Sequence, residues 1–199
     1  MAIVDRKPAR RVGVGNMYLC FHNRESDTIS FEETVERLKT LTSITIDDAA
    51  EVENVFGSNE IYDADSSGAA PAITMSALAL TPTQKARMKG NTVSNGYILS
   101  STYDDGEYFA YGVVYPKRNG HFSYVWYPKC KAVSISDEAQ TRDDDGINSQ
   151  APEVNIQTYP FDDTGKYKVE YDTELLETGA TRVTEAAFFA APLMAPING

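Results

Sequence analysis

The residue types that most often perform chemistry are scarce in this chain, and their spacing forms no catalytic arrangement. The two histidines, His22 and His121, lack the partner spacing of a zinc-binding helix or finger. Each lies in or beside a strand-like pattern, so we expect a hydrogen-bonding structural role. Cys20 and Cys130 fall in similar patterns, which favour buried, free thiols in a reducing cytoplasm. The sequence leaves open whether the two cysteines form a disulfide.

Carboxylates are abundant, but they occur as neighbours within turns. Neighbouring carboxylates do not give the separation of about 5–9.5 Å that flanks a glycosidic bond. Asp63, Asp65 and Ser67 have the offsets of a calcium loop, yet Thr74 stands where a bidentate glutamate is needed. The turn at 141–152 fails in the same way, so we expect solvated loops at both places.

Glycine and serine motifs are equally incomplete. Gly13-Val14-Gly15 is a fragment of a dinucleotide-binding fingerprint without a third glycine or a preceding strand, and we interpret it as a hinge. No Gly-x-Ser-x-Gly nucleophile motif occurs. The chain is therefore predicted to be no enzyme and to hold no cofactor and no metal.

Composition predicts one folded, acidic domain. The chain has 199 residues, 42% of them hydrophobic and 24% charged, and a net charge of −11. This charge argues against a protein that grips nucleic acid through its phosphates, which needs clustered Lys and Arg. No stretch has the apolar core of a secretory signal or the roughly 20 apolar residues of a membrane helix, so no membrane insertion is expected.

The elements that must position these residues are mostly strands. Twelve tyrosines and eight phenylalanines alternate with polar residues between closely spaced turn signals. We predict a three-stranded meander over 97–133, formed by Tyr97–Tyr103, Tyr108–Tyr115 and a strand from Phe122 onward, each half-buried. In the last of these strands, the pattern puts Cys130 on one face with Tyr124 and Trp126. Further strands are expected at 17–22, 43–47, 73–80, 154–159 and 166–172.

The sequence predicts one helix and leaves a second stretch open between helix and strand. Thr81 and Pro82 can begin a helix and Gly90 can end it, which predicts a helix at about 82–89. The stretch at 30–38 fits either a helix with a capping box or a strand. The predicted fold class is mainly β: an antiparallel β-sandwich or barrel with one short flanking α-helix.

The two ends differ from the body. We divide the chain into a basic N-terminal arm at 1–16, a single domain at 17–182 and an apolar C-terminal arm at 183–199. The N-terminal arm carries four basic residues and one acid, whereas the rest of the chain carries 14 basic residues and 28 acids. The opposite charges would let the arm contact the acidic body of another copy. Alternatively, the arm is a solvated terminus. The apolar end either docks on a neighbouring subunit or folds onto its own sandwich. The arm candidates are Arg6, Lys7, Arg10, Arg11, Phe188, Phe189, Leu193 and Met194.

The order of these patterns over about 12–173 resembles the major tail proteins of siphophages, which have long non-contractile tails. The resemblance rests on Tyr108-x-Ala110-x-Gly112, on an Asn-Gly turn leading to Tyr124-Val125-Trp126, and on Ala151-Pro152-Glu153-Val154 before an acidic turn and a Lys/Tyr strand. "LTSITID" and the following "NEIYDADSSGAAPAITMSALALTP" also resemble the middle of that family. The segment at 51–58 is less regular than the family pattern, and 183–199 looks like an extension.

The resemblance implies a β-sandwich subunit that forms hexameric rings, which stack into the tube through which the phage genome leaves. Partners would be other copies of the chain and the tape-measure, tail-terminator and tail-tip proteins. Double-stranded DNA would pass without specific binding. The protein would reside in the virion tail, after synthesis in the host cytoplasm. Contacts between rings would be made by the arms.

An acidic tube would repel DNA rather than hold it, because both carry negative charge. Four acids are the candidates to face the lumen of this tube, because they lie on or beside the expected middle strands: Asp47, Glu51, Glu53 and Glu60. The alternative function is a phage β-sandwich binding module, such as a tail-tip or head-decoration domain. Such a module could stack a sugar on Tyr108, Tyr111, Tyr124 and Trp126, although alternating aromatics in strands are more often core or interface residues.

Overall fold

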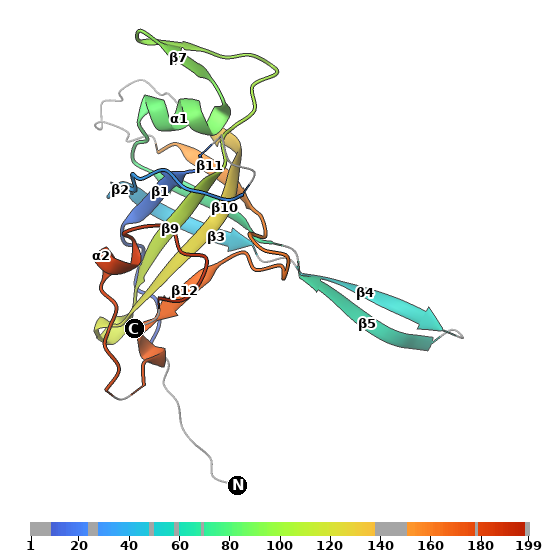
Figure 1. The fold of residues 1–199 in the computed structure, drawn as a ribbon. Helices are drawn as coiled ribbons and strands as arrows, with labels where there is room; N and C mark the ends of the chain where they lie inside the picture. Colours follow the sequence, from blue (N-terminus) through green and yellow to red (C-terminus); the bar gives the residue numbers. More distant parts are fainter. Residues whose placement is uncertain are drawn as a thin grey trace, which may run out of the picture.

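The protein consists mainly of antiparallel strands (Figure 1). A computed structural model describes residues 9–23, 28–47, 50–57, 60–68, 70–137, 151–177 and 179–197, with the backbone alone at 50–57 and 60–68. The strands are β1 (Met17–Phe21), β2 (Glu36–Leu38), β3 (Leu41–Asp47), β4 (Ala50–Gly57), β5 (Glu60–Gly68), β6 (Ala72–Ala77), β7 (Thr92–Ser94), β8 (Tyr97–Leu99), β9 (Phe109–Pro116), β10 (Phe122–Ser136), β11 (Glu153–Thr158) and β12 (Val169–Asp172). The helices are α1 (Pro82–Lys89) and α2 (Glu185–Phe188), with short 3-10 turns η1 (Arg118–Gly120) and η2 (Thr173–Leu175).

Eight strands form one sheet around the long strand β10. Their order is β2-β1-β9-β10-β11-β6-β3, and β12 also pairs with β10. The first half of β10 lies between β9 and β12, and its second half pairs with β11. A bulge between Tyr127 and Cys130 marks this change of partner, and it contains Pro128, which has no N–H for a regular ladder.

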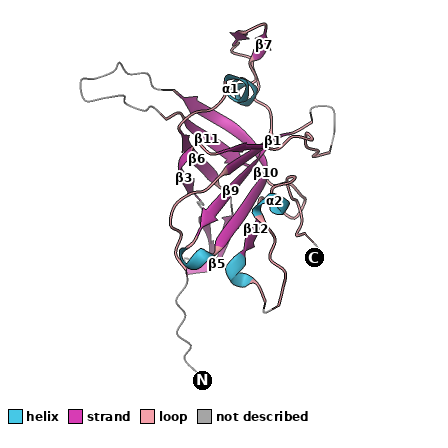
Figure 2. Ribbon diagram, turned by 90° about the vertical axis from the view of Figure 1, so that its left-hand side faces the viewer, coloured by secondary structure: helices cyan, strands magenta, loops and turns pink. Residues whose placement is uncertain are grey.

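The sheet folds over itself, as Figure 2 shows, so that β6 and β11 pack across from β1 and β9. The buried side chains of these four strands form one cluster, which includes Leu19, Ile73, Tyr111 and Ile156. The prediction of a mainly β, antiparallel sandwich with one short flanking helix is confirmed. The strands expected at 17–22, 43–47, 73–80, 154–159 and 166–172 correspond to β1, β3, β6, β11 and β12.

Strand β9 is buried on both faces, whereas its alternation predicted a half-buried strand. Phe109, Tyr111 and Val113 lie in the core inside the sandwich. Ala110 and Val114 belong to a second cluster on the opposite face. The half-buried prediction is wrong because the C-terminal segment covers the outer face of the strand.

The bulge in β10 also changes which face its residues occupy. Cys130 was expected on the face of Tyr124 and Trp126, but it lies in the inner core with Val125 and Tyr127. One extra residue in a strand reverses the alternation beyond it. Cys130 and Cys20 are both buried and both free, so the disulfide that the sequence left open is not formed.

The predicted meander over 97–133 is correct for β9 and β10 and wrong for its first strand. Strand β8 pairs with β7 and not with β9. The cause is the turn at Asn95-Gly96, where both residues have positive φ, 47° and 84°, as a two-residue hairpin requires. Gly106, which we expected to join two strands, instead packs on α1: a Cβ there would lie 2.1 Å from the carbonyl oxygen of Met88.

Helix α1 occupies the residues that the sequence predicted. The Thr81 hydroxyl accepts a hydrogen bond from the Gln84 N–H, and the Gln84 side chain accepts one from the Thr81 N–H. Gly90 ends the helix in the left-handed region, with φ of 76°. The ambiguous stretch at 30–38 contains the strand β2 and no helix.

Among the described strands, β4 and β5 pair with each other alone, and they project away from the main sheet (Figure 1). One expectation is wrong here. The segment at 51–58, whose sequence is less regular than the family pattern, lies in strand β4 up to Gly57. The acidic stretch from Asp63, expected to be a solvated loop, lies in β5, where backbone pairing with β4 holds it extended. The second acidic turn, at 141–152, falls largely outside the described residues.

Candidate functional site

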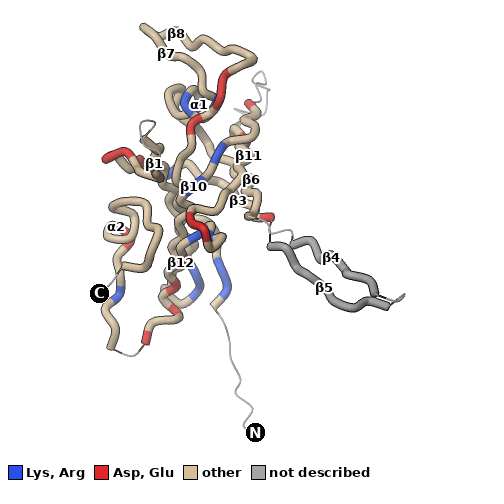
Figure 3. The backbone as a smooth tube through the Cα atoms, turned by 45° about the vertical axis from the view of Figure 1, so that its right-hand side comes forward, with Lys and Arg blue, Asp and Glu red and all other residues tan. Residues whose placement is uncertain are grey.

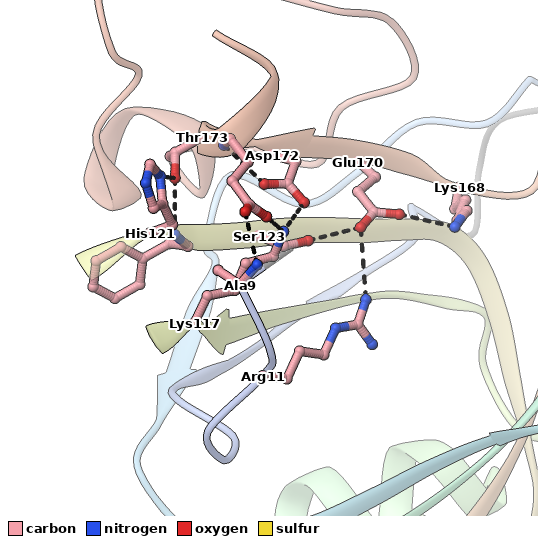
Figure 4. A network of polar contacts seen from close by, with 11 residues as sticks. Ala9, Arg11, Lys117, His121, Ser123, Lys168, Glu170, Asp172 and Thr173 are labelled. Atoms are coloured by element: carbon pink, nitrogen blue, oxygen red, sulfur yellow. Dashed lines mark hydrogen bonds and ion pairs between the residues drawn. The ribbon is translucent and has the colours of Figure 1, made fainter. Parts of the chain in front are cut away.

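The beginning of the described chain lies along the end of strand β9, as Figure 4 shows. Backbone hydrogen bonds join the Val12 N–H to the Pro116 carbonyl at 2.9 Å and the Arg118 N–H to the Arg10 carbonyl at 2.9 Å. The Gly15 N–H donates to the Val114 carbonyl at 2.8 Å. The interpretation of residues 13–15 as a hinge is therefore wrong, because this stretch is fastened to the sheet on both sides.

Charged side chains complete this attachment. Lys117 forms ion pairs with Asp172 and, at 2.6 Å, with Glu174, and its side chain is only 11% exposed. Glu174 also accepts a hydrogen bond from the Ala9 N–H at 2.9 Å. Burial alone would lower the pKa of Lys117, but its hydrogen bonds to the two carboxylates raise it above the usual value. The hydrogen bond from Lys117 lowers the pKa of Glu174.

Arg11 is held by a ring and a carboxylate of its own chain. Its guanidinium lies 4.1 Å from the centre of the Tyr115 ring and 3.7 Å from a carboxylate oxygen of Glu170. Glu170 also accepts hydrogen bonds from Ser123 at 2.7 Å and Lys168 at 2.9 Å. Burial by itself would raise the pKa of Glu170, and these donors lower it instead. We call the contacts of Ala9, Arg11, Lys117, Glu170 and Glu174 the N-terminal tether.

The predicted arm residues thus fall into three groups. Arg11 belongs to the tether, while Arg10 is exposed and its backbone carbonyl accepts a hydrogen bond from the Arg118 N–H of η1. In Figure 3, basic parts of the tube, drawn in blue, lie beside β12. Arg6 and Lys7 lie outside the described residues. A role for all four between subunits stays a prediction.

The C-terminal segment packs on the outer face of the sheet. Phe188 and Phe189 are each 3% exposed, and the Trp126 indole donates to the Phe188 carbonyl at 3.1 Å. Leu193 is partly buried against the same cluster, whereas Met194 is 41% exposed. The apolar C-terminal end was expected either to dock on a neighbouring subunit or to fold onto its own sandwich. In the single chain described here, it folds onto its own sandwich.

Helix α2 is fixed by polar contacts to the first strand. Glu185 accepts hydrogen bonds from the Tyr18 hydroxyl and from the Asn16 amide, each at 2.6 Å. The Thr184 hydroxyl caps the helix by accepting from the Ala187 N–H at 3.2 Å. Burial, followed by Glu185, raises the pKa of Tyr18 to about 12, so its hydroxyl stays protonated and donates.

The acids predicted to face a lumen lie on two different elements. Asp47 is exposed at the end of β3, which is the last strand on its side of the sheet. Glu51 and Glu53 lie in β4, and Glu60 begins β5. The backbone register places Glu53 opposite Asp65 and Glu60 opposite Gly57. The side chains of these last three acids lie outside the described part of the chain.

The aromatic patch required by the alternative function does not form. Tyr111 and Trp126 are 0% exposed and Tyr124 is 4% exposed, and only Tyr108, at 37%, reaches the surface. A sugar cannot stack on rings that the sandwich and the C-terminal segment already cover. Tyr111, Tyr124 and Trp126 are therefore core residues, which is the commoner role of alternating aromatics in strands, and they do not form a binding patch.

The titratable groups of the described residues form no catalytic arrangement. Burial lowers the pKa of His22, whose Nε2 lies 2.8 Å from the Pro128 carbonyl oxygen, a group that can only accept. Burial raises the pKa of Cys20 to about 11 and raises that of Cys130 further, so both are poor nucleophiles. Within the described ranges, no three His, Cys, Asp or Glu residues lie where they could hold a metal ion.

One hollow in the described surface has a volume of about 610 Å³ and is open to solvent. It lies beside His22, Gly106, Glu107, Tyr108 and Lys129. His22, whose pKa is lowered by burial, makes the structural hydrogen bond described above. None of the helices in the described chain has the length and apolarity that a bilayer crossing requires.

Sequence reasoning missed the β7–β8 hairpin, whose apolar side chains lie on the surface. The signal was present at Asn95-Gly96, but we joined Tyr97 to the following strand instead of the preceding one. Strand β7 has only three residues, too few for its alternation to show.

Comparisons with known proteins give likeness in structure and none in sequence. No family model matches the sequence, and no curated protein matches it significantly. Among solved structures, a chain in the cryo-EM structure of the anti-feeding prophage (AFP) baseplate is similar to this chain, with a TM-score of 0.47 and 6% sequence identity. The match covers 84% of this chain and 97% of that one. A likeness of this degree assigns neither a family nor a function to the protein.

Proposed function

We propose that the chain is a structural protein of a phage tail, a major tail protein that forms hexameric rings and stacks them into the tube that delivers the genome. The observation that carries the proposal is the open edge of β3. Among the described strands, this seven-residue strand pairs with β6 alone and forms one end of the sheet. An unpaired edge of this length invites another strand.

Ring formation would add a strand of the next copy to the edge of β3. Native monomers protect such edges with Lys, Pro or a covering loop. Leu41–Asp47 contains no Lys and no Pro, and Thr42, Ser43 and Thr45 are exposed. The seven residues offer roughly 23 Å of pairable backbone, at about 3.3 Å per residue.

Stacking would use the projecting β4–β5 hairpin and the two termini. The hairpin extends beyond the main sheet, where it can reach another copy (Figure 1). The tether fixes Ala9 at one end of the sheet, so Arg6 and Lys7 would leave the subunit from a defined position. Their positive charge suits a neighbour that is acidic overall.

The acidic composition supports a conduit for DNA. Duplex DNA carries one negative charge per about 1.7 Å of its axis, so an acidic wall does not bind it. Asp47 lies at the end of the edge strand that we propose to line the ring, and Glu51, Glu53 and Glu60 follow on β4 and β5. We propose that these four acids face the lumen and keep the passage of DNA non-specific.

In this proposal the protein is no enzyme, uses no cofactor and resides in the virion. It would be made in the host cytoplasm and would meet the tape-measure, tail-terminator and tail-tip proteins during assembly. The resemblance of the sequence to siphophage major tail proteins supports these partners.

Blocking the β3 edge tests the proposal. We would replace Ser43 and Thr45 with Lys, because charge on an edge strand discourages pairing, and use Thr83→Lys on the exposed side of α1 as a matched control. The purified proteins would be compared by sedimentation velocity and negative-stain electron microscopy. Wild type and the control should form rings or rods, and the edge variant should stay monomeric with an unchanged circular dichroism spectrum. Rings from the edge variant would contradict the proposal.

A further inference from the structure

The β7–β8 hairpin concentrates exposed apolar surface. Its two strands pair only with each other among the described strands, and all six of their residues are exposed. Five large hydrophobic residues of the segment at 92–103 face solvent: Val93 at 49%, Tyr97 at 71%, Ile98 at 46%, Leu99 at 63% and Tyr103 at 93%. Contiguous apolar exposure of this kind marks an interaction surface in a soluble protein.

The apolar side chains occupy both faces of the hairpin. Val93 pairs with Ile98, and these two share one face. Tyr97 and Leu99 are offset by one residue from Ile98 and therefore share the other. A hairpin that only covered its own body would be apolar on one face, so this one is suited to insert between two surfaces.

The hairpin is rigidly attached, although an isolated two-stranded hairpin is only marginally stable in water. Before β7, the Asn91 N–H donates to the Ala86 carbonyl of α1 at 2.8 Å. In the chain that returns after β8, the Glu107 N–H donates to the Arg87 carbonyl of α1 at 3.1 Å. Gly90 and Asp105 are in such close contact that a Cβ on Gly90 would lie 2.2 Å from the Asp105 carbonyl oxygen. The position of the hairpin on α1 is thus preorganised, which reduces the cost of binding.

An apolar counterpart lies at the opposite end of the molecule. Strand β9 begins just after the base of the hairpin and ends at Pro116, where Val12 is attached. Val12 is 52% exposed, and Leu175, next to Glu174 of the tether, is 82% exposed. Figure 1 shows the hairpin at the top and the beginning of the described chain at the bottom. A contact between the hairpin and this region can only join different molecules.

We infer that the β7–β8 hairpin inserts into a second copy of this chain, at the surface around Val12 and Leu175. Because the two surfaces differ and lie at opposite ends, the contact is head-to-tail and repeats without closing. The segment at 92–103 is about half of the 20–30 residues that each side of a stable interface usually supplies. It therefore suits a polymer in which each subunit makes several contacts, better than a free-standing dimer.

This inference rests on the proposed function and identifies one contact between stacked rings. The β3 edge would close a ring, and the hairpin would join one ring to the next. Loss of the hairpin contact should therefore leave rings intact and remove rods, an outcome distinct from failure of ring formation.

The first test changes the charge of one hairpin face. Val93→Lys combined with Ile98→Lys places two ammonium groups in the contact, and Thr83→Lys, at an exposed position of α1 outside the hairpin, is the control. We expect wild type and the control to form rods and the double variant to form single rings, by negative-stain electron microscopy. Rods of normal length from the double variant would overturn the inference and leave the proposed function standing. Wild-type protein that forms no rings would contradict both the inference and the proposed function.

The second test maps the partner surface with cysteines. Cys20 and Cys130 are 1% and 0% exposed, so a thiol-reactive bismaleimide should join only introduced thiols. We expect cross-linked dimers from a mixture of Ile98→Cys and Leu175→Cys chains, and a ladder from the chain that carries both. Ile98→Cys alone should give no dimer above the wild-type background. Dimers from Ile98→Cys alone would indicate a hairpin-to-hairpin contact and overturn the inference, as would rods in which the mixture gives no cross-link.

Discussion

The ring of Phe189 lies flat against the ring of Tyr18, with centroids 4.0 Å apart and planes within 4° of parallel. This contact joins the C-terminal segment to the first strand of the sheet. Trp126 and Tyr124 complete the surroundings of Phe189, with ring centroids at 5.3 and 5.8 Å. The C-terminal segment is therefore part of the fold and covers a second core.

Removing the Phe189 ring tests whether this segment is part of the folded domain. Phe189→Ala should lower the free energy of unfolding by about 3–5 kcal/mol, because a buried aromatic ring is replaced by a cavity. Met194→Ala, at an exposed position of the same segment, should change it by less than about 0.5 kcal/mol. Urea denaturation measures both. Equal, small effects would mean that the segment does not cover the sheet in solution.

Gly112 lies beneath the same ring and gives a second test. A Cβ there would lie 2.8 Å from Cε1 of Phe189 and 2.9 Å from Cζ3 of Trp126. Gly112→Ala should therefore destabilise the protein by about 1–3 kcal/mol through overpacking. In the Phe189→Ala background this penalty should fall, because the nearer atom is gone. A penalty that is the same in both backgrounds, measured by denaturation of all four proteins, would contradict this packing.

The N-terminal tether should loosen in acid. Glu170 and Glu174 have pKa values below the usual 4.5, so their contribution is complete above that pH and is lost as the pH falls through their lower folded values. Lys117 has a raised pKa, so its contribution is lost only as the pH rises through that higher value. Hydrogen exchange of the Val12 and Arg118 amides, relative to their intrinsic rates, should be slowest between these limits.

The control for the tether is a carboxylate outside it. Glu174→Gln should increase exchange at the two amides near neutral pH and remove part of their acid response. Glu177→Gln, at an exposed neighbouring position, should change neither. Identical profiles for the two variants would show that Glu174 does not hold the N-terminal segment.

Reversing the charge of the proposed lumen should slow the passage of DNA. Lysines at Asp47, Glu51, Glu53 and Glu60 would attract phosphates within a screening distance of roughly 8 Å. In a phage that carries these substitutions, DNA release should be slower, and the effect should weaken as salt is raised. The control replaces four exposed acids elsewhere with lysine: Glu33, Glu153, Asp163 and Glu177. Equal release from both phages would contradict the lumen assignment.

The parts of the fold that the sequence predicted are those set by local signals. Thr81, Pro82 and Gly90 delimit α1 because capping depends on a few neighbouring residues, and the Asn119-Gly120 turn joins β9 to β10 in the same way. Strand β8 was misassigned because pairing is a choice between two neighbours, and the preceding one was too short to recognise. Cys130 was placed on the wrong face because a bulge gives no reliable local signal.

The candidate surfaces were predicted less well, for a related physical reason. The basic residues near the N-terminus looked like a free arm, yet Arg11 is bound by Tyr115 and Glu170, which are distant in sequence. Phe188 and Phe189 were recognised as needing cover, but the sequence could not say which surface covers them. Burial of one segment by another depends on the whole topology, which pattern analysis does not supply.

The central claim is that many copies of this chain close into a hollow tube. Electron microscopy of the purified full-length protein over a range of concentrations tests it most directly, with antibodies against the protein applied to phage particles in parallel. We predict hollow rods with six-fold end views, and labelling along the tails. Protein that stays monomeric at every concentration, together with particles whose tails the antibodies do not label, would contradict the claim.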